Sequence, residues 1–268
     1  MRVECSTNGE PTIIERCQSF RPLMDDGHFF SHVTAAIIYG LPVPPEHEAS
    51  RLIHVSVMIP RRAPRGDGII GHKLRVDPDT LRLWNGLRVP PPIEVWCELA
   101  SMMSIDDLIV AGDAIVRRRD PLGSTADLAS AAADAVNRPG VKRLRSALES
   151  IRARTDSPME TRLRLAIARA GLPEPEVNWA VLGTDGSFKG FADLAFPQYR
   201  VIVEYDGDQH RSDPDQYFSD VDRLWTFQTL EWRIVRVNKS HTANGCAEAI
   251  DRIRTALAQQ RVATRRRS

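Results

Sequence analysis

The sequence predicts an α/β (α+β) protein, with a mixed sheet flanked by helices in its second half and a smaller α+β domain before it. After residue 157, the hydrophobic patterns indicate a helix, three strands, a helix, a strand and a helix, an order typical of a sheet covered by helices. Before that point the chain is rich in proline and contains two apolar strand candidates. The composition, with 42% hydrophobic and 26% charged residues, is that of an ordinary globular protein.

The amino-terminal domain is expected to span residues 1–120. Strands are predicted at 52–59 and 69–76, where apolar runs lie between segments rich in proline and glycine. After Pro92, apolar residues three and four positions apart indicate a helix, and 104–118 is predicted to form a second one. This domain therefore combines strands with helices.

The next segment, residues 121–156, is rich in alanine, arginine and leucine and is expected to be a helical basic linker. Its positive charge has two interpretations, which are contacts with phosphates or a solvated face held by local salt bridges.

The carboxy-terminal domain is expected to span residues 157–260 and to be followed by a basic tail at 261–268. Its first helix begins after Ser157 and ends at Gly171. The other predicted elements are strands at 177–182, 191–196 and 201–205, a helix at 215–230, a strand at 233–237 and a helix at 247–259.

Charge and cysteine content exclude several classes of protein. The formal net charge of +1 excludes a strongly basic, histone-like binder but not a local basic surface. The four cysteines contain no CxxC pair, which argues against a disulfide framework and favours a reducing compartment. No apolar run approaches the roughly 20 residues that span a bilayer, and the first residues lack the apolar region of a secretory signal. We therefore expect a cytoplasmic protein without a membrane partner.

Carboxylates interrupt two of the predicted strands. Alternate side chains of a strand share a face, which places Glu204 and Asp206 on one side of strand 201–206. Asp193 lies within the otherwise apolar strand 191–196. Because a buried carboxylate is costly unless it is paired or bound to a metal, we expect Asp193 and Glu204 to converge on a Mg²⁺ or Mn²⁺ ion. Such an ion activates water and stabilises the charge on a phosphodiester during hydrolysis.

Four further polar residues are considered as site residues and have alternative interpretations. Taken alone, Glu160 is expected to complete a capping box that begins at the helix start. Asp206 is either a turn residue or part of the site, and His210 is either a loop histidine or a group that moves protons. His32 lies four positions after another histidine, a spacing compatible with a metal, but no acid supports it and a structural role is expected.

Five short segments of the carboxy-terminal domain, taken in order, resemble the restriction-endonuclease-like PD-(D/E)XK superfamily. The nearest likeness is to bacterial endonuclease domains akin to very-short-patch-repair endonucleases, and it covers residues 157–260. The segments are SPMETRLR (157–164), ADLAFP (192–197), VEYDGDQH (203–210), DR (222–223) and WRIVR (232–236).

The resemblance implies a metal-dependent nuclease site. Asp193 and Glu204 take the metal-binding acid positions of the superfamily, and Glu160 is the acid of its first helix. At Asp206 the chain departs from the pattern, because many members have there a lysine that orients the attacking water. A histidine contributes in the very-short-patch-repair branch, so His210 is the candidate to replace that lysine.

Three arginines are candidates for contacts with nucleic acid, namely Arg162, Arg223 and Arg236. Arg223 and Arg236 are equally suited to pair with a nearby aspartate.

The amino-terminal domain is similar to AbiEi-type antitoxin domains, although only some 30 residues precede the match and a full winged helix is not expected. The matching segments are FFSHVTAA (29–36), YGLP (39–42), VPPP (89–92), LA (99–100) and DDLIVAGD (106–113).

Two functions follow from these patterns. The first is a metal-dependent DNA endonuclease that hydrolyses phosphodiester bonds with Mg²⁺ or Mn²⁺. The second is a non-catalytic DNA-binding antitoxin or transcriptional regulator on a degenerate nuclease fold. DNA is the expected partner of both, and the amino-terminal likeness adds a cognate toxin to the second. The oligomeric state does not follow from the sequence.

Overall fold

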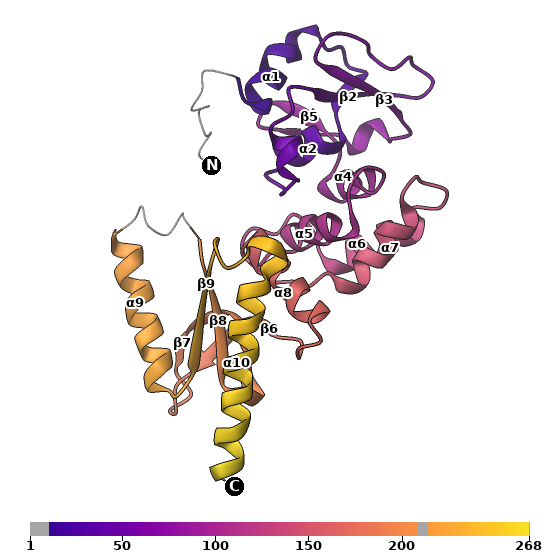
Figure 1. The fold of residues 1–268 in the computed structure, drawn as a ribbon. Helices are drawn as coiled ribbons and strands as arrows, with labels where there is room; N and C mark the ends of the chain where they lie inside the picture. The colour runs from indigo at the N-terminus through magenta and orange to yellow at the C-terminus, as the bar shows by residue number, and fades with distance from the viewer. Residues whose placement is uncertain (1–10, 208–213, 268) are drawn as a thin grey trace. The chain divides into compact units, whose positions relative to one another are not determined.

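A computed structural model of the chain describes the backbone of residues 11–207 and 214–267 and the side chains of 11–207 and 221–261. The chain divides into two compact units, each of which contains helices and strands (Figure 1). Unit 1 comprises Met1–Val116 and Asp120–Ile151, and unit 2 comprises Arg117–Arg119 and Arg152–Ser268. The predicted α/β (α+β) class is confirmed.

Unit 1 contains a three-stranded sheet of order β1-β2-β3, in which β2 pairs antiparallel with β1 and parallel with β3. A separate hairpin joins β4 and β5. The elements of unit 1 are α1 (Ile13–Phe20), β1 (His28–Phe30), α2 (His32–Ile38), α3 (Pro45–Glu48), β2 (Ile53–Met58), β3 (Ile69–Leu74), β4 (Arg82–Trp84), β5 (Leu87–Val89), α4 (Pro92–Leu99), α5 (Ile105–Ile115), α6 (Thr125–Asp134) and α7 (Val141–Ser150).

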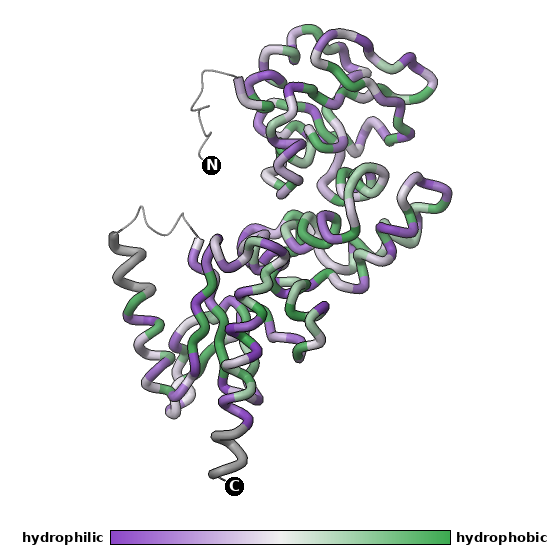
Figure 2. Tube along the Cα trace, in the orientation of Figure 1, coloured by the Kyte–Doolittle hydropathy of each residue, from purple (hydrophilic) through white to green (hydrophobic). Residues whose placement is uncertain are grey.

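The helical part of unit 1 is built around α4 and α5, which are largely hydrophobic in Figure 2. Helices that are apolar on most of their circumference are those that other elements surround. The indole of Trp96 is fully buried, and its Nε1–H donates a 2.9 Å hydrogen bond to the carbonyl of Leu108. This bond joins α4 to α5 while satisfying the one polar atom of the ring.

The segment 121–156, expected to be a helical basic linker, contains helices α6 and α7, and residues up to 151 group with unit 1. Helices α6 and α7 bury Leu128 and Leu144 completely or nearly so, and both helices belong to unit 1. Their basic residues have local partners, since Arg138 forms an ion pair with Glu94 and Arg143 donates to the carbonyl of Met103. At these positions the basic side chains therefore have local partners, as in the second of the two interpretations.

Unit 2 is a four-stranded mixed sheet of order β6-β7-β8-β9, with helices on both faces (Figure 1). Strands β6, β7 and β8 pair antiparallel, whereas β8 and β9 are parallel because α9 carries the chain from one to the other. The elements of unit 2 are α8 (Pro158–Arg169), β6 (Glu176–Leu182), β7 (Phe188–Phe196), β8 (Val201–Asp206), α9 (Pro214–Thr229), β9 (Arg233–Asn238) and α10 (Ala243–Arg267).

Each face of this sheet has its own hydrophobic core. Val203 of β8 packs with Leu163 of α8 and Ile253 of α10 on one face. Ile202 packs with Phe227 of α9 on the other. Successive residues of β8 thus point to opposite faces, and Glu204 belongs to the face that α9 covers.

The carboxy-terminal tail also differs from the prediction, because α10 continues to Arg267 instead of ending near residue 259.

The cysteines of the described part, Cys17, Cys97 and Cys246, are free and buried. Across the residues searched, every helix is too short or too polar to traverse a bilayer.

The turn before α7 depends on a glycine. Gly140 has a φ of +82°, and a Cβ placed on it would lie 2.0 Å from the carbonyl oxygen of Ala100. Gly40, also in unit 1, has a φ of +70° but no atom within 4 Å of such a Cβ. A side chain at Gly40 would therefore cause backbone strain alone, whereas one at Gly140 would cause backbone strain and a steric clash.

We expect Gly140→Ala to destabilise unit 1 far more than Gly40→Ala. Both variants bear the left-handed backbone cost of roughly 1–2 kcal/mol. In Gly140→Ala the backbone at Ala100 must also move, which adds on the order of 1–3 kcal/mol. Urea unfolding followed by circular dichroism measures the difference, and equal losses in the two variants would contradict the packing at this turn.

Candidate functional site

The pairing of β7 with β8 brings the strand segments that carry two of the predicted acids near each other. Leu194 and Val203 form the last registered pair at one end of the ladder, and Asp193 and Glu204 come next on their strands. The Oδ2 atom of Asp193 accepts a 2.8 Å hydrogen bond from the backbone N–H of Tyr205. The side chain of Asp193 is thereby held against the strand that carries Glu204.

Glu204 is buried and has an arginine partner. Its side chain is 8% exposed and forms two charge-assisted hydrogen bonds with Arg223 of α9. The Nη1–Oε1 distance is 3.3 Å and the Nη2–Oε2 distance is 3.0 Å. The same Nη1 donates to the carbonyl of Phe191, at 2.6 Å. The guanidinium group therefore bridges α9, β7 and β8 and compensates the charge of a carboxylate that would otherwise be costly to bury.

A glycine makes room for this arginine. A Cβ on Gly190 of β7 would lie 2.9 Å from Cδ of Arg223, and its φ is +142°. Beyond it, the guanidinium carbon lies 5.6 Å from the ring centre of Phe227, within the range of a cation–π contact. The path of the arginine over β7 thus requires a residue without a side chain at 190.

Glu160 enters the site from the first turn of α8. Ser157 is confirmed as the N-cap, because its Oγ accepts a 3.2 Å hydrogen bond from the N–H of Glu160, but the capping box predicted for Glu160 is incomplete. The carboxylate of Glu160 accepts a 3.0 Å bond from the N–H of Asp156, one residue before the cap. Glu160 is 5% exposed, so this helix start holds a carboxyl group in the interior of unit 2.

Asp193 interacts electrostatically with both of the buried glutamates. Burial raises the pKa of Glu160 and of Glu204 well above the ordinary glutamate value, and the charge of Asp193 raises both further. Arg223 opposes the rise at Glu204. Like charges held together in a poorly solvated place favour protonation or a bound cation. Asp193 of β7 is thus the acid that links Glu160 of α8 electrostatically with Glu204 of β8.

The other predicted site residues have different surroundings. Asp206 forms a 2.7 Å ion pair with Arg236 of β9. Arg162 is half-buried on α8, and its charge lowers the pKa of Cys246 against the larger effect of burial. His210 lies outside the described residues. Two of the arginine candidates for phosphate contacts, Arg223 and Arg236, thus pair with carboxylates of the same unit.

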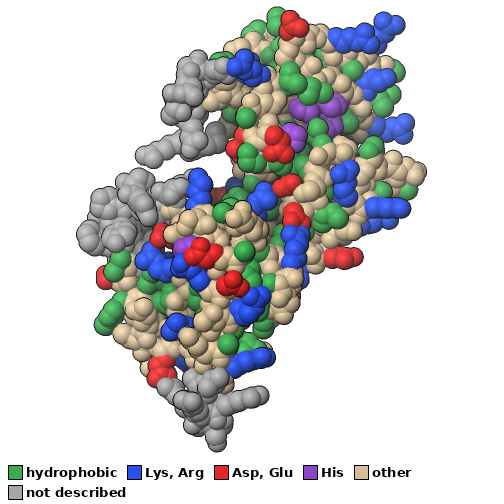
Figure 3. Space-filling view, viewed as in Figure 1, with side chains coloured by type: hydrophobic (Ala, Val, Ile, Leu, Met, Phe, Trp, Pro, Cys, Tyr) green, Lys and Arg blue, Asp and Glu red, His purple; other side chains and the backbone are tan. Residues whose placement is uncertain are grey.

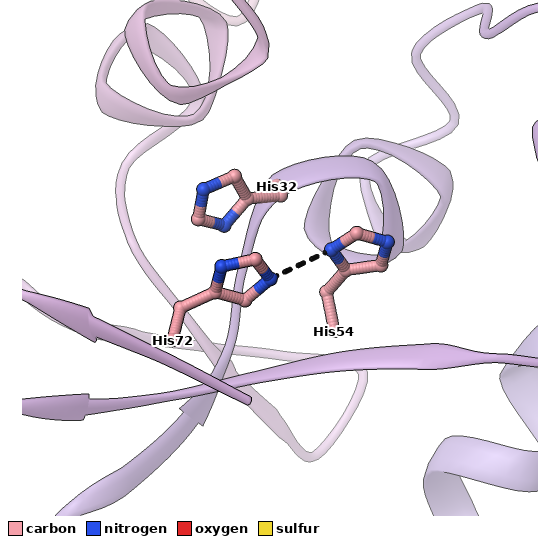
Figure 4. A group of neighbouring side chains, drawn as sticks. All are labelled: His32, His54 and His72. Carbon is pink, nitrogen blue, oxygen red and sulfur yellow. Dashed lines mark hydrogen bonds between the residues drawn. The ribbon is translucent and has the colours of Figure 1, made fainter. Parts of the chain in front are cut away.

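A second group of polar side chains, in unit 1, was missed by sequence reasoning. His28 bonds to Asp25 at 2.8 Å, whereas His32 meets His54 of β2 and His72 of β3 (Figure 4). One ring nitrogen from each of these three lies within 4.8 Å of the others. Burial lowers the pKa of His32 to about 3 and that of His54 to about 4, with further lowering from the charge of His72. These rings are therefore neutral at pH 7.

This group could have been found in the same way as Asp193, by looking for a polar residue inside an apolar strand candidate. His54 interrupts an apolar strand candidate, and His72 interrupts the next. Their separation in sequence matches none of the short ligand spacings of zinc motifs. Only the parallel pairing of β2 with β3, which sets Ser56 opposite His72, brings the two rings close.

Neither a family model nor a solved structure matches the chain. The chain is similar to "Uncharacterized protein MT2308" and "Uncharacterized protein Rv2248", from the CDC 1551 / Oshkosh and H37Rv strains of Mycobacterium tuberculosis. Each is 27% identical over 229 residues, which cover 85% of this chain and 80% of the relative. Because neither unit alone is that long, the similarity extends over parts of both units.

Proposed function

We propose that unit 2 is a metal-dependent DNA endonuclease in which Asp193 and Glu204 hold a Mg²⁺ or Mn²⁺ ion. Glu160 contributes to the same ion through a water molecule. The observation that carries the proposal is that Asp193 of β7 is bonded to the strand of Glu204 and that its charge raises the pKa of the buried Glu160 and Glu204. The sequence resemblance supplies the substrate class, and these interactions among the expected acids support it.

The donor set fits a hard divalent cation. Mg²⁺ and Mn²⁺ prefer carboxylate oxygens and keep several water ligands. Both oxygens of Glu204 bond to Arg223, yet a carboxylate oxygen has a second lone pair for a metal. The cation would also relieve the repulsion that raises the pKa of Glu160 and Glu204. These residues therefore suit the ion without loss of the arginine contact.

A bound divalent ion supplies an activated water and stabilises negative charge on the phosphate. The protein residues position the reacting groups. The N–H of Tyr205 fixes Asp193, and Arg223 fixes Glu204. Arg223 also places a positive charge beside the acids, where the resemblance leads one to expect a lysine and the chain has Asp206. The proton for the leaving oxygen is assigned to His210 on sequence grounds alone.

One observation favours the second candidate, a non-catalytic DNA-binding regulator with a cognate toxin as partner. Glu204 is paired with Arg223 and Asp206 with Arg236, so neither carboxylate needs a metal for charge compensation. This candidate predicts salt-sensitive DNA binding that is independent of divalent ions.

Plasmid nicking by the full chain in Mg²⁺ or Mn²⁺ tests the endonuclease. We expect Asp193→Asn and Glu204→Gln to lower the nicking rate by more than about 100-fold, since even outer-shell partners of a metal contribute roughly 10–100-fold. Glu176→Gln, an exposed glutamate of β6, is the matched control and should nick at the native rate.

Two results would overturn the proposal. One is equal nicking by all four proteins, which would indicate a contaminating nuclease. The other is an absence of nicking in every metal while the native chain binds DNA equally well with Mg²⁺ and with a chelator. The second result is the one that the regulator predicts.

A pH experiment tests whether the raised pKa of Glu160 affects the stability of the chain without metal. Glu160 has a raised pKa in the folded state, so its contribution to stability is present at low pH and is lost as the pH rises through that value. Glu160→Gln carries no titratable group. In chelator, we expect the native free energy of unfolding to fall more than that of Glu160→Gln between about pH 5 and about pH 9.

Urea unfolding at the two pH values gives this difference, and amide exchange at β8 assigns it to unit 2. Titrating groups that do not interact with Glu160 are common to both proteins and cancel. Parallel losses in the native chain and Glu160→Gln would contradict a raised pKa of Glu160 in the folded chain.

A further inference from the structure

The histidine cluster of unit 1 comes from three separate segments. His32 stands at the start of α2, His54 lies in β2 and His72 in β3 (Figure 4). The Nδ1 of His54 lies 2.9 Å from the Nε2 of His72, and the rings of His32 and His72 are 4.0 Å apart between centres. With one nitrogen of each within 4.8 Å of the others, small side-chain rotations bring them to the separation of about 3.3 Å that tetrahedral Zn–N bonds require.

A buried carboxylate lies beside this cluster. Glu98 of α4 has a side chain only 1% exposed, and its Oε2 lies 3.6 Å from Nδ1 of His32 and accepts a 2.7 Å bond from the N–H of that residue. Its other oxygen, Oε1, is buried and has no hydrogen-bond partner among the described residues. Buried polar atoms are rarely left in this state, because each unmet bond costs free energy. A cation held by the histidines would compensate the carboxylate.

The surrounding side chains orient the imidazoles. Ser31 Oγ lies 3.0 Å from Nδ1 of His32 and accepts a 2.6 Å bond from Ser56 Oγ. The backbone N–H of His54 donates a 2.8 Å hydrogen bond to Thr34 Oγ1, which fixes the main chain at that residue. Serine and carboxylate contacts to one ring nitrogen leave the other free to bind, an arrangement common around metal-bound histidines.

The backbone at His32 is strained. Its φ of +51° lies in the left-handed region, which a residue with a side chain enters only when its surroundings hold it there. The bond to Glu98 and the packing against His72 supply that constraint. Strain of this kind is concentrated at binding sites.

We propose that His32, His54 and His72 bind a single Zn²⁺-class transition-metal ion, with Glu98 acting from beside His32 to orient it. Imidazole nitrogens select zinc and similar metals over Mg²⁺, so this site is chemically distinct from the acid cluster of unit 2. Three protein ligands leave a fourth position for water or another ligand. Histidine side chains of unit 1 are visible at the surface in Figure 3, and within the cluster His72 is only half-buried.

Zinc titration of the metal-stripped full chain tests this proposal. We expect one equivalent of Zn²⁺ per native chain by elemental analysis, and an affinity more than about 10-fold lower in His54→Gln and in His72→Gln. His28→Gln, the same substitution at the histidine bonded to Asp25, is the matched control and should bind as the native chain does. Asp193→Asn should also retain zinc, which separates this site from the proposed nuclease.

Native affinity in both His54→Gln and His72→Gln would overturn the proposal, as would an absence of Zn²⁺ binding tighter than about 10 μM in the native chain. If these variants fail to fold, X-ray absorption on the native zinc-loaded chain decides. Nitrogen neighbours at roughly 2.0–2.1 Å with imidazole scattering would support the site. A shell of oxygen or sulfur without imidazole would exclude it.

Discussion

The antiparallel register between β7 and β8 decides where the acids of unit 2 lie. It pairs Leu194 with Val203 at the end of the ladder, and Asp193 and Glu204 are the next residues on the two strands. A shift of one residue would turn Glu204 to the face where Val203 packs against α8 and α10. The hydrophobic residues on both sides of β8 prevent that shift. The core therefore positions the acids, and the acids themselves contribute repulsion.

That repulsion is contained by specific partners. Glu204 is bonded to Arg223, Asp193 to the N–H of Tyr205 and Glu160 to the N–H of Asp156. Burying such groups is less favourable than burying hydrophobic residues of similar size, so their retention in the interior favours a functional reason over a stabilising one. The same reasoning applies to Glu98 in unit 1, whose carboxylate also lies among buried residues. Each unit thus holds one cluster of polar groups that its hydrophobic core does not need.

Sequence reasoning succeeded where a local pattern carries the information. Asp193 and Glu204 stood out because each interrupts an apolar strand, and Ser157 because it precedes a proline and a helical pattern. It did not indicate how the helices of 121–156 pack, because whether a helix such as α7 packs on α5 or stands apart depends on contacts that its own sequence does not contain. It missed His54 and His72 because their proximity arises from the pairing of β2 with β3. It also did not predict the pairing of Arg223 with Glu204, since a phosphate and a nearby aspartate were the two partners considered for that arginine.

The close contact between Gly190 and the side chain of Arg223 links two residues that are far apart in the sequence. A larger residue at 190 would meet the arginine stem that crosses β7, and the φ of +142° favours glycine there independently of Arg223. A side chain at 190 would therefore disturb the arginine that compensates the charge of Glu204. Related sequences that keep both the glycine at 190 and the arginine at 223 would be expected to keep the buried ion pair with Glu204 as well.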